Sequence, residues 1–382
     1  MKYRVCKRCV MDTSDPLIIF DDFGNCNHCT TSLAAIEQGS LNSQLWDPAD
    51  KTNSLGKIIV TLHKAQERSK YCGVLGLSGG IDSSFVTIKM KEYGLNPLVV
   101  HVDTGWNSQI AVRNIKSVLD YCGFDLYTYV VNWEEMRSLQ LAYLKSGLSN
   151  LDVPQDHLIF ATLFKVAREK GLKYFISGGN LATESINPPS WHEGSAIDSV
   201  SLKAINEKYG TLPLRSFNII GFFDYYITLP FILKIRTVRP LNLMYYNREA
   251  AIKILESLTG WNNYGRKHGE SFFTKVFQND FLPRRYGYDK RRPHYSSQIV
   301  SGFMTREQAV EKLSEPLYEK SEFEDDIRFF CKKLKISRFE YEYYIKQPQR
   351  SFYEFPNWQR RYEVLKNINK FIEIVSGWRY RH

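Results

Sequence analysis

The stretch GLSGGIDSS at residues 76–84 constrains the fold of this chain more than any other. It follows an apolar run, CGVLGL at 72–77, and leads into a segment with apolar residues at helical spacing that ends at Gly94. Two adjacent glycines, Gly79 and Gly80, let backbone N–H groups approach anionic oxygens, and the positive end of the following helix points to the same place. The stretch therefore predicts a strand, a phosphate-binding loop and a helix in succession.

This loop differs from the kinase and GTPase type because it lacks the lysine of the G-x-x-x-x-G-K-[ST] pattern. Asp82 instead places a carboxylate at the mouth of the loop, which is compatible with phosphate if the carboxylate holds Mg²⁺. Ser78, Ser83 and Ser84 add hydroxyl donors. A glycine turn without a ligand is the alternative, but it does not account for three serines and an aspartate around the glycine pair.

Apolar runs of strand length alternate with helical segments between residues 57 and 250. The alternation predicts an α/β fold with a doubly wound parallel sheet. Such sheets bind ligands at the carboxyl ends of their strands, where three polar loops occur here: LSGGIDSS, DTGWNS and SGGNLATES. The strands are expected at 72–77, 95–103, 125–132 and 173–179, with a fifth candidate at 237–244.

Four of the seven cysteines form two C-x2-C pairs, Cys6 with Cys9 and Cys26 with Cys29. Each pair directs two thiolates at one ion, and two pairs complete a tetrahedral Zn²⁺ site that has no open position for catalysis. We therefore expect a structural zinc ribbon, with an iron–sulfur cluster as the alternative and no ligand role for His28. The other cysteines are isolated, which is typical of a reducing compartment rather than of a secreted disulfide framework.

Half of the formal net charge of +10 lies in one segment, because residues 264–292 hold eight Lys and Arg against three Asp and Glu. Such a charge is compatible with nucleic acid, a membrane surface or an anionic small substrate. The longest apolar stretch, 218–233, is interrupted by Asp224 and Pro230 and is too short for a membrane span. Since the N-terminus has no apolar signal core, we expect a cytoplasmic protein.

The types and spacing of the residues along the sequence divide the chain into four parts. Residues 1–37 carry the cysteine pairs, and residues 38–56 are polar and turn-rich. Residues 57–250 hold the alternating strands and helices, and residues 251–382 are helical and aromatic. We expect these parts to be a zinc ribbon, a linker, the α/β domain and a basic C-terminal substrate region.

Several motifs, in the same order along the chain, resemble those of the bacterial N-acetyl sugar amidotransferases. They are CKRCVMDTSDP, GNCNHC, SGGIDSSF, HVDTGWNSQIA, NWEEM, DVPQDHLIF, SGGNLATES, RKHGESFFTK and YGYDKRR. SGGIDSS by itself resembles the pyrophosphate loop of the wider PP-loop ATP pyrophosphatase superfamily, whose domain is HUP-like. The resemblance implies that ATP adenylylates the oxygen of an acetamido group on a nucleotide-linked sugar acid. Ammonia then displaces AMP and leaves an acetamidino group, in the biosynthesis of O-antigen or a related lipopolysaccharide.

The resemblance also implies an ATP site made by three loops. The first loop would hold pyrophosphate, the end of the second strand would contact adenosine, and the third loop would complete the nucleotide site. Magnesium would lie between the first and third loops. The residues implied for ATP and pyrophosphate are Ser78, Gly79, Gly80, Asp82, Ser83, Ser84, Val102, Asp103, Gly178 and Asn180, and those for magnesium are Asp82 and Glu184.

The basic C-terminal motifs and one helix start supply the remaining candidates. The basic residues would clamp pyrophosphate or the phosphates of the substrate, and the others would line the sugar site. The alternatives are solvated surface charges for the first set and ordinary helix capping for the helix start. The candidates are, for catalysis, Asp82, His268, Lys275, Lys290 and Arg291, and, for substrate binding, Gln155, Asp156, His157 and Glu270.

Ammonia is expected to come from outside this chain. Glutamine hydrolysis needs a nucleophilic cysteine with a base, whereas Cys72 lies in a predicted strand and Cys122 and Cys331 lie in helical segments without a neighbouring histidine. Lys2 excludes a cysteine nucleophile at a mature N-terminus. The resemblance implies a separate glutaminase with a channel subunit, similar to imidazole-glycerol-phosphate synthase, and no nucleic-acid partner. Two alternative functions remain. One is that of a tRNA-thiolating enzyme, which needs further reactive cysteines, and the other is that of a non-catalytic scaffold of a glycan assembly complex.

Overall fold

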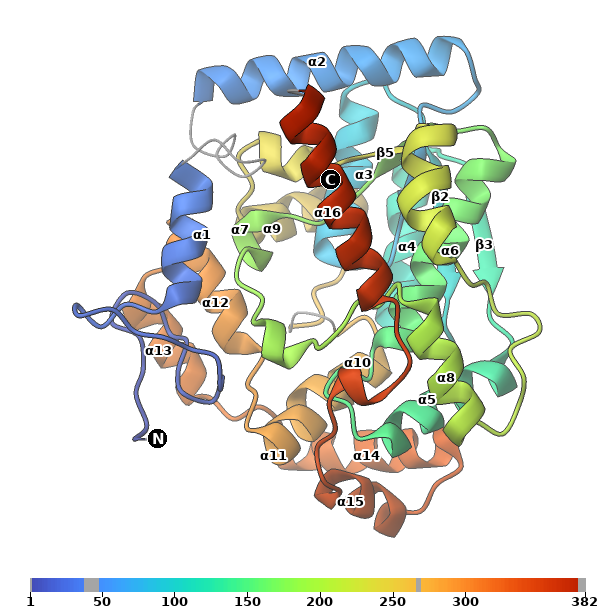
Figure 1. Cartoon of the computed structure of the whole chain (residues 1–382). Helices are drawn as coiled ribbons and strands as arrows, with labels where there is room; N and C mark the ends of the chain where they lie inside the picture. The colour runs from blue at the N-terminus through green and yellow to red at the C-terminus, as the bar shows by residue number, and fades with distance from the viewer. Residues whose placement is uncertain (1, 38–47, 266–268, 377–382) are drawn as a thin grey trace.

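The computed structural model describes residues 2–37, 48–265 and 269–376. At its centre is a sheet of five parallel strands in the order β3-β2-β1-β4-β5 (Figure 1). The predicted doubly wound parallel sheet is therefore confirmed, with its fifth strand shorter than the expected run. The strands are β1 (Val74–Gly76), β2 (Leu98–Asp103), β3 (Leu126–Val130), β4 (Tyr174–Ile176) and β5 (Arg236–Val238).

The strand order reverses beside β1, which places a topological switch point in the middle of the sheet. β1 pairs with β2 on one side, with Val74 opposite Leu98, and with β4 on the other, with Val74 opposite Phe175. The connections after β1 and β4 leave the sheet in opposite directions, so a crevice opens between them at the carboxyl ends of the strands. The loops LSGG and SGGN follow these two strands and border the crevice.

Both faces of the sheet are buried, because alternate side chains of each strand enter two different apolar cores. Val74 and Phe175 belong to one core, whereas Leu75 and Ile176 belong to the other. The first core is covered by α5 (Trp133–Ser146) and α6 (Val153–Glu169), and the second by α3 (Ile81–Glu92), α4 (Gln109–Cys122) and α9 (Arg248–Thr259).

The N-terminal part begins with the cysteine pairs and continues into α1 (Asn27–Glu37) and the long α2 (Pro48–Glu67), which crosses the top of the molecule in Figure 1. The stretch 48–56, which we expected to be linker, is therefore the first half of α2. Proline at the first position of a helix is well tolerated, because its missing N–H would have no intrahelical partner there. The rest of the expected linker, 38–47, lies outside the described residues.

Beyond α9 the chain is helical, as predicted. α11, α14 and α15 lie together below the sheet in Figure 1, and α16 runs back across it. The elements are α10 (Phe272–Val276), η5 (Phe277–Phe281), α11 (Leu282–Tyr286), α12 (Arg291–Val300), α13 (Arg306–Ser314), α14 (Lys320–Leu334), α15 (Arg338–Lys346), η6 (Phe352–Glu354) and α16 (Gln359–Ser376). Shorter connections before α9 are α7 (Leu181–Glu184), η2 (Pro189–Trp191), α8 (Ser199–Tyr209), η3 (Asp224–Ile232) and η4 (Pro240–Leu243).

The apolar stretch 218–233 contains η3, a π-helical segment that packs under the start of α16. The rings of Tyr226 and Tyr362 lie 5.4 Å apart, and Phe222 contacts Trp358 at 5.4 Å. Aromatic pairs at these distances bury large areas and fix the C-terminal helix to the α/β domain. Within the described ranges, none of the helices combines the length and the apolar character that a membrane span requires.

We expect Gly79→Ala to destabilise the protein more than Gly123→Ala. Both glycines have positive φ, 80° and 73°, so either alanine adds left-handed strain of about 1–2 kcal/mol. A Cβ at Gly79 would also lie 2.5 Å from the carbonyl oxygen of Ala111, whereas one at Gly123 meets nothing within 4 Å. Denaturant unfolding should show an extra loss of at least about 1 kcal/mol for Gly79→Ala. Equal losses would contradict the close approach of the loop to α4.

Candidate functional site

The loop between β1 and α3 has the form of a phosphate cradle. Gly79 takes the left-handed conformation, and Gly80 caps α3 without a side chain that would occupy the helix N-terminus. The hydroxyl oxygens of Ser78 and Ser83 lie 3.1 Å apart, and Ser78 Oγ accepts a hydrogen bond from Gly80 N at 3.2 Å. Both hydroxyls are thus held at the loop. Ser84, which was expected to join them, is buried in the interior and does not line the loop cavity.

The loop after β4 closes the cradle from the opposite side of the switch point. A Cβ at Gly178 would lie 2.9 Å from the backbone of Asp82 and Ser83, so this glycine allows the two loops to touch. A cavity of about 210 Å³ lies between them, and we call it the loop cavity. It is lined by Ser78, Gly80, Ile81, Asp82, Ser83, Gly178, Gly179, Thr183, Glu184, Arg248, Tyr264 and Glu270.

Asp82 is anchored at the loop cavity by Tyr246, whose hydroxyl donates a hydrogen bond to the carboxylate. Burial, and then the charge of Asp82, raises the pKa of Tyr246, which therefore remains a neutral donor. Glu184 lines the same cavity. Two carboxylates beside a phosphate cradle match the donor set of Mg²⁺, which completes its shell with phosphate oxygens and water. The donors present at the loop cavity therefore fit magnesium.

Two charged side chains, Glu270 and Arg248, also line the loop cavity, and the motifs did not predict this position for either of them. A Cβ at Gly80 would lie 2.9 Å from Glu270 Oε1, so this carboxylate borders the phosphate loop. Arg248 lines the cavity from the first turn of α9. A cation at a helix N-terminus opposes the helix dipole, so an anionic ligand in the cavity accounts better for this arginine than helix stability does. The proximity arises from the fold, because Arg248 is distant from the loop in the sequence.

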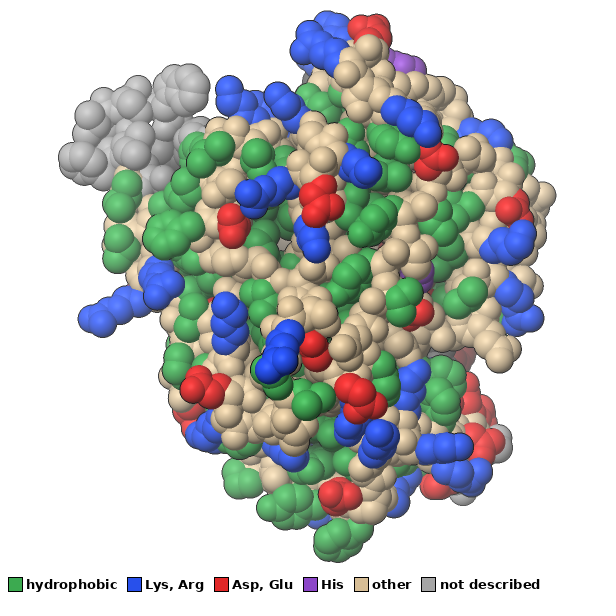
Figure 2. Space-filling view, turned by 90° about the vertical axis from the view of Figure 1, so that its right-hand side faces the viewer, with side chains coloured by type: hydrophobic (Ala, Val, Ile, Leu, Met, Phe, Trp, Pro, Cys, Tyr) green, Lys and Arg blue, Asp and Glu red, His purple; other side chains and the backbone are tan. Residues whose placement is uncertain are grey.

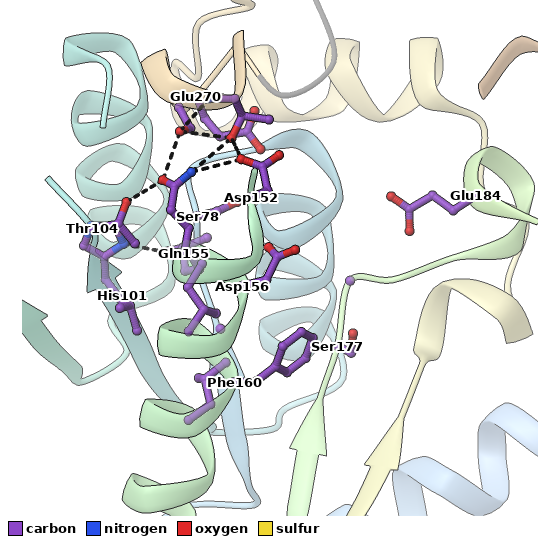
Figure 3. A pocket seen from close by; sticks show the side chains of 18 of the residues that line it. Ser78, His101, Thr104, Asp152, Gln155, Asp156, Phe160, Ser177, Glu184 and Glu270 are labelled. Atoms are coloured by element: carbon purple, nitrogen blue, oxygen red, sulfur yellow. Dashed lines mark hydrogen bonds between the residues drawn. The ribbon is translucent and has the colours of Figure 1, made fainter. Parts of the chain in front are cut away.

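A larger cavity of about 550 Å³, the substrate cavity, opens at the carboxyl ends of β1, β2 and β4 (Figure 3). One wall carries a hydrogen-bond network centred on Gln155, a predicted substrate residue. Its Oε1 accepts from Thr104 Oγ1 at 2.8 Å, and its Nε2 donates to Asp152 Oδ1 at 3.1 Å. Thr274 from α10 donates to the same oxygen at 2.9 Å. This network ties the α/β domain to the C-terminal region across the cavity.

Asp152 and Asp156 face the substrate cavity one helical turn apart on α6. Burial raises the pKa of Asp152 to about 6. Burial, reinforced by the charge of Asp152, raises the pKa of Asp156 to about 8, while Lys290 opposes both shifts. Lys290 donates to His192 Nε2, which is a neutral acceptor because burial lowers the pKa of His192 to about 3. Asp152 opens the motif DVPQDHLIF but was not predicted as a site residue, and His192 lies outside the motifs, whereas Lys290 was predicted from its motif and lines this cavity.

Three predicted residues serve the fold instead of lining a cavity. His157 was expected at the sugar site, but its Nδ1 donates to the carbonyl oxygen of Ala196 at 3.0 Å and its Nε2 accepts from Ile220 N at 3.3 Å. It therefore joins two connections away from the substrate cavity. Asn180 caps α7, and Asp103 accepts from Gly105 N at 2.8 Å to shape its own loop. Val102, the remaining predicted contact of adenosine, does line the substrate cavity.

The basic segment borders a third cavity of about 660 Å³, which shares Gln278, Lys290 and His294 with the substrate cavity. Lys275 lines it but is paired with Glu322 at 2.6 Å and Asp326 at 2.7 Å. Its predicted role in clamping pyrophosphate is therefore not supported by its position. On the face shown in Figure 2, Lys and Arg side chains are scattered with Asp and Glu between them.

Arg291, a predicted clamp residue, also lines the third cavity, and its guanidinium is held by the surrounding structure. Its guanidinium pairs with Asp289 at 2.8 Å and donates to the carbonyl oxygens of Lys312 and Glu315 at the end of α13. A cation at a helix C-terminus is favourable, so this arginine fastens α13 to the start of α12. His268, the last of the predicted catalytic residues, lies outside the described residues.

The four predicted ligand cysteines come together as a buried cluster. Cys6 Sγ lies 3.7 Å from Cys29 Sγ, and Cys9 Sγ lies 3.6 Å from Cys26 Sγ. A tetrahedron with metal–sulfur bonds of about 2.3 Å has edges of about 3.8 Å, so the spacing fits one Zn²⁺ ion. His28 is directed elsewhere, since its Nε2 pairs with Asp15. Among the described residues, this is the one group of three or more such side chains that is assembled closely enough for a metal ion.

The cysteine knuckle (residues 3–29) docks on α12 and α13 instead of standing apart from the fold (Figure 1). Arg306 donates to the carbonyl oxygen of Cys6 at 3.2 Å, and Arg292 donates to that of Val10 at 2.8 Å. Val10 N in turn donates to Ser296 Oγ at 3.2 Å. Lys290 immediately precedes α12, so the knuckle supports the helix start that carries Lys290 to the substrate cavity.

The sheet and the loop define the class of the chain as an α/β domain of the PP-loop type, with S-G-G-x-D-S-S at the switch point. Two solved structures are similar to it. NMN synthetase from Francisella tularensis has 13% identity and a TM-score of 0.28, over 58% of this chain and 89% of its own. U34-tRNA thiolase NcsA from Methanococcus maripaludis, with its 4Fe-4S cluster, has 16% identity and a TM-score of 0.30, over 85% of this chain and 96% of its own. Likeness at this level bears on neither the activity nor the ligands of this chain.

The C-terminal region specifies the chain further. Residues 270–369 match the family model described as LPS biosynthesis protein WbpG-like, C-terminal domain. This stretch of the chain is therefore similar to the C-terminal domain of the WbpG-like lipopolysaccharide biosynthesis proteins. No curated protein matches the chain. The matched region begins at Glu270, so it includes a side chain that borders the loop cavity.

Arg248→Ala should weaken the binding of magnesium pyrophosphate about tenfold, or roughly 1.4 kcal/mol, because it removes a cation from the loop cavity. Titration calorimetry measures the affinity directly. Arg113→Ala, on the exposed face of α4, is the matched control and should bind like the unaltered protein. An unchanged affinity in Arg248→Ala would show that this arginine does not contact the anion.

Proposed function

We propose that this protein is an ATP-dependent enzyme of lipopolysaccharide biosynthesis that converts an acetamido group of a nucleotide-linked sugar to an acetamidino group. The observation that carries the proposal is the continuity of the loop cavity with the substrate cavity, since Ser78, Gly178, Glu184 and Glu270 line both. Phosphates held at the loop and a polar substrate in the larger cavity would meet at these shared walls. The WbpG-like domain supports the assignment to lipopolysaccharide biosynthesis.

The cradle suits cleavage of ATP between the α- and β-phosphates. The amide oxygen would attack the α-phosphorus while the bond to the bridging oxygen breaks. The leaving pyrophosphate would then be stabilised by the N-terminus of α3, the hydroxyls of Ser78 and Ser83, and Arg248. When bound between Asp82 and Glu184, magnesium would neutralise phosphate oxygens. A lysine for transfer of the γ-phosphoryl group is not required, which is consistent with its absence from the loop.

In the second half of the reaction, ammonia adds to the carbon of the activated amide, and AMP leaves with the former amide oxygen. The cysteines outside the knuckle are unsuited to supplying this ammonia from glutamine. Burial raises the pKa of Cys72 and of Cys122 to about 12, and that of Cys331 to about 11. Thiolates are therefore disfavoured at all three, which supports a separate glutaminase with a channel subunit and weighs against tRNA thiolation.

For the knuckle we propose a structural Zn²⁺ ion. The distances of 3.6 and 3.7 Å between sulfur atoms suit a single ion. In a cubane cluster each cysteine binds a different iron atom, so its sulfurs must stand farther apart. Four thiolates close the coordination shell and leave no open position for catalysis, so the metal would stabilise the knuckle and, through it, α12.

Incubation of the purified chain with ATP, ammonium and acetamido nucleotide-sugars should yield AMP and an amidine. Mass spectrometry identifies the product, which is lighter than the substrate by the difference between an oxygen atom and an NH group. Glutamine should not replace ammonium, because the chain provides no reactive thiolate. Asp82→Asn should lower the rate at least about a hundredfold, since it removes a ligand for the phosphate-bound metal. Failure of every acetamido sugar to yield AMP would favour a scaffold instead.

Elemental analysis should find one zinc per chain, without the visible absorption of an iron–sulfur cluster. Cys9→Ser should lose the metal and destabilise the protein by about 4 kcal/mol or more, as expected when a structural metal is lost. Cys72→Ser is the matched control, a buried cysteine outside the knuckle that should retain the zinc. Iron in place of zinc, or full metal content in Cys9→Ser, would contradict the assignment.

A further inference from the structure

The substrate cavity contains two carboxyl groups for which phosphate binding provides no role. Asp152, the N-cap residue of α6, and Asp156, in the first turn of that helix, lie four residues apart and therefore share one face. Both line the substrate cavity, whereas neither lines the loop cavity. Their function must therefore concern what enters the substrate cavity.

The two carboxyl groups differ in their hydrogen bonds. Asp152 Oδ1 accepts from Gln155 at 3.1 Å and from Thr274 at 2.9 Å. No side chain in the described part of the chain donates a hydrogen bond to the carboxyl group of Asp156. Figure 3 shows that group on the same side of α6 as Asp152, outside the dashed network and directed into the cavity. Asp152 is thus a fixed part of the wall, and Asp156 offers its oxygens to a ligand.

The charges around Asp156 favour a protonated ligand that can give up a proton. Asp152 on α6 and Lys290 at the start of α12 act on the carboxyl group, and neutral His192 holds Lys290. Burial and Asp152 raise the pKa of Asp156 to about 8. A carboxylate of this basicity takes a proton from an ammonium ion far more readily than an ordinary surface carboxylate does.

The proposed reaction needs a base, because ammonium must lose a proton before its nitrogen can attack the activated amide. In neutral water the nucleophile is almost entirely protonated and has no lone pair with which to attack. We propose that Asp156 is the general base that binds ammonium in the substrate cavity and converts it to ammonia. One N–H bond breaks, its proton bonds to a carboxylate oxygen of Asp156, and its electron pair stays on nitrogen as the attacking lone pair. This inference rests on the proposed function and adds to it the catalytic group for the second half-reaction.

The test compares two nucleophiles in the isosteric variant Asp156→Asn. Hydroxylamine is a neutral free base at neutral pH, so it needs no deprotonation before it attacks. The rate of AMP formation with ammonium should fall at least about a hundredfold in the variant, whereas the rate with hydroxylamine should change by only a few fold. Asp120→Asn, an exposed residue of α4, is the matched control and should keep both rates. The ratio of the two rates does not depend on how much of the variant is folded.

Equal losses with both nucleophiles in Asp156→Asn would overturn the inference, because a base is needed for ammonium alone. Retention of the ammonium rate would overturn it as well. If the unaltered protein forms no amine-dependent AMP with either nucleophile, the proposed function fails before Asp156 is tested, so the two failures are distinguishable.

Discussion

The site depends on one close contact, the seating of Gly178 against the first turn of α3. Parallel strands diverge at a switch point, and side chains normally keep the loops beyond β1 and β4 apart. A Cβ at Gly178 would lie within 3 Å of the α3 backbone, so glycine alone lets the second loop close over the N-terminus of the helix. This closure defines the loop cavity and places Glu184 on the same cavity as Asp82. The shape of the loop cavity is therefore a consequence of backbone packing.

The C-terminal region contributes side chains to the cavities at the carboxyl ends of the strands. Glu270 reaches the phosphate loop, Thr274 joins the Gln155 network, and Lys290 enters the substrate cavity. The helix that follows Lys290 is held from behind by the cysteine knuckle, through Arg292 and Ser296. Removal of a metal from the knuckle would therefore disturb the position of Lys290 in the substrate cavity, although no cysteine lines that cavity. The α/β domain and the C-terminal region line the cavities together, and the knuckle supports α12 from behind.

The sequence predicted well those features that depend on local backbone geometry. The glycine pair between an apolar run and a helix indicated the cradle, and the C-x2-C pairs indicated the cluster. It predicted less well which side chains face a cavity. His157 carries suitable chemistry, but its hydrogen bonds to Ala196 and Ile220 give it a structural role away from the cavities. Arg248 and His192 were missed because no local pattern marks them, and Asp152 was missed although it opens the motif DVPQDHLIF.

The sequence by itself determined the α/β class, the glycine-rich loop without a kinase lysine, and a four-cysteine cluster. Each follows from a pattern that can be read along the chain: alternating strand-length and helix-length runs, a short glycine–serine motif, and two closely spaced cysteine pairs. Only the tertiary structure decided which charged groups border the cavities. A basic motif specifies a charge, but distant elements decide which side chains surround that charge and which cavity it borders. Lys275 and Lys290 illustrate the difference: the first is held by Glu322 and Asp326 from α14, whereas the second faces the substrate cavity beside Asp156.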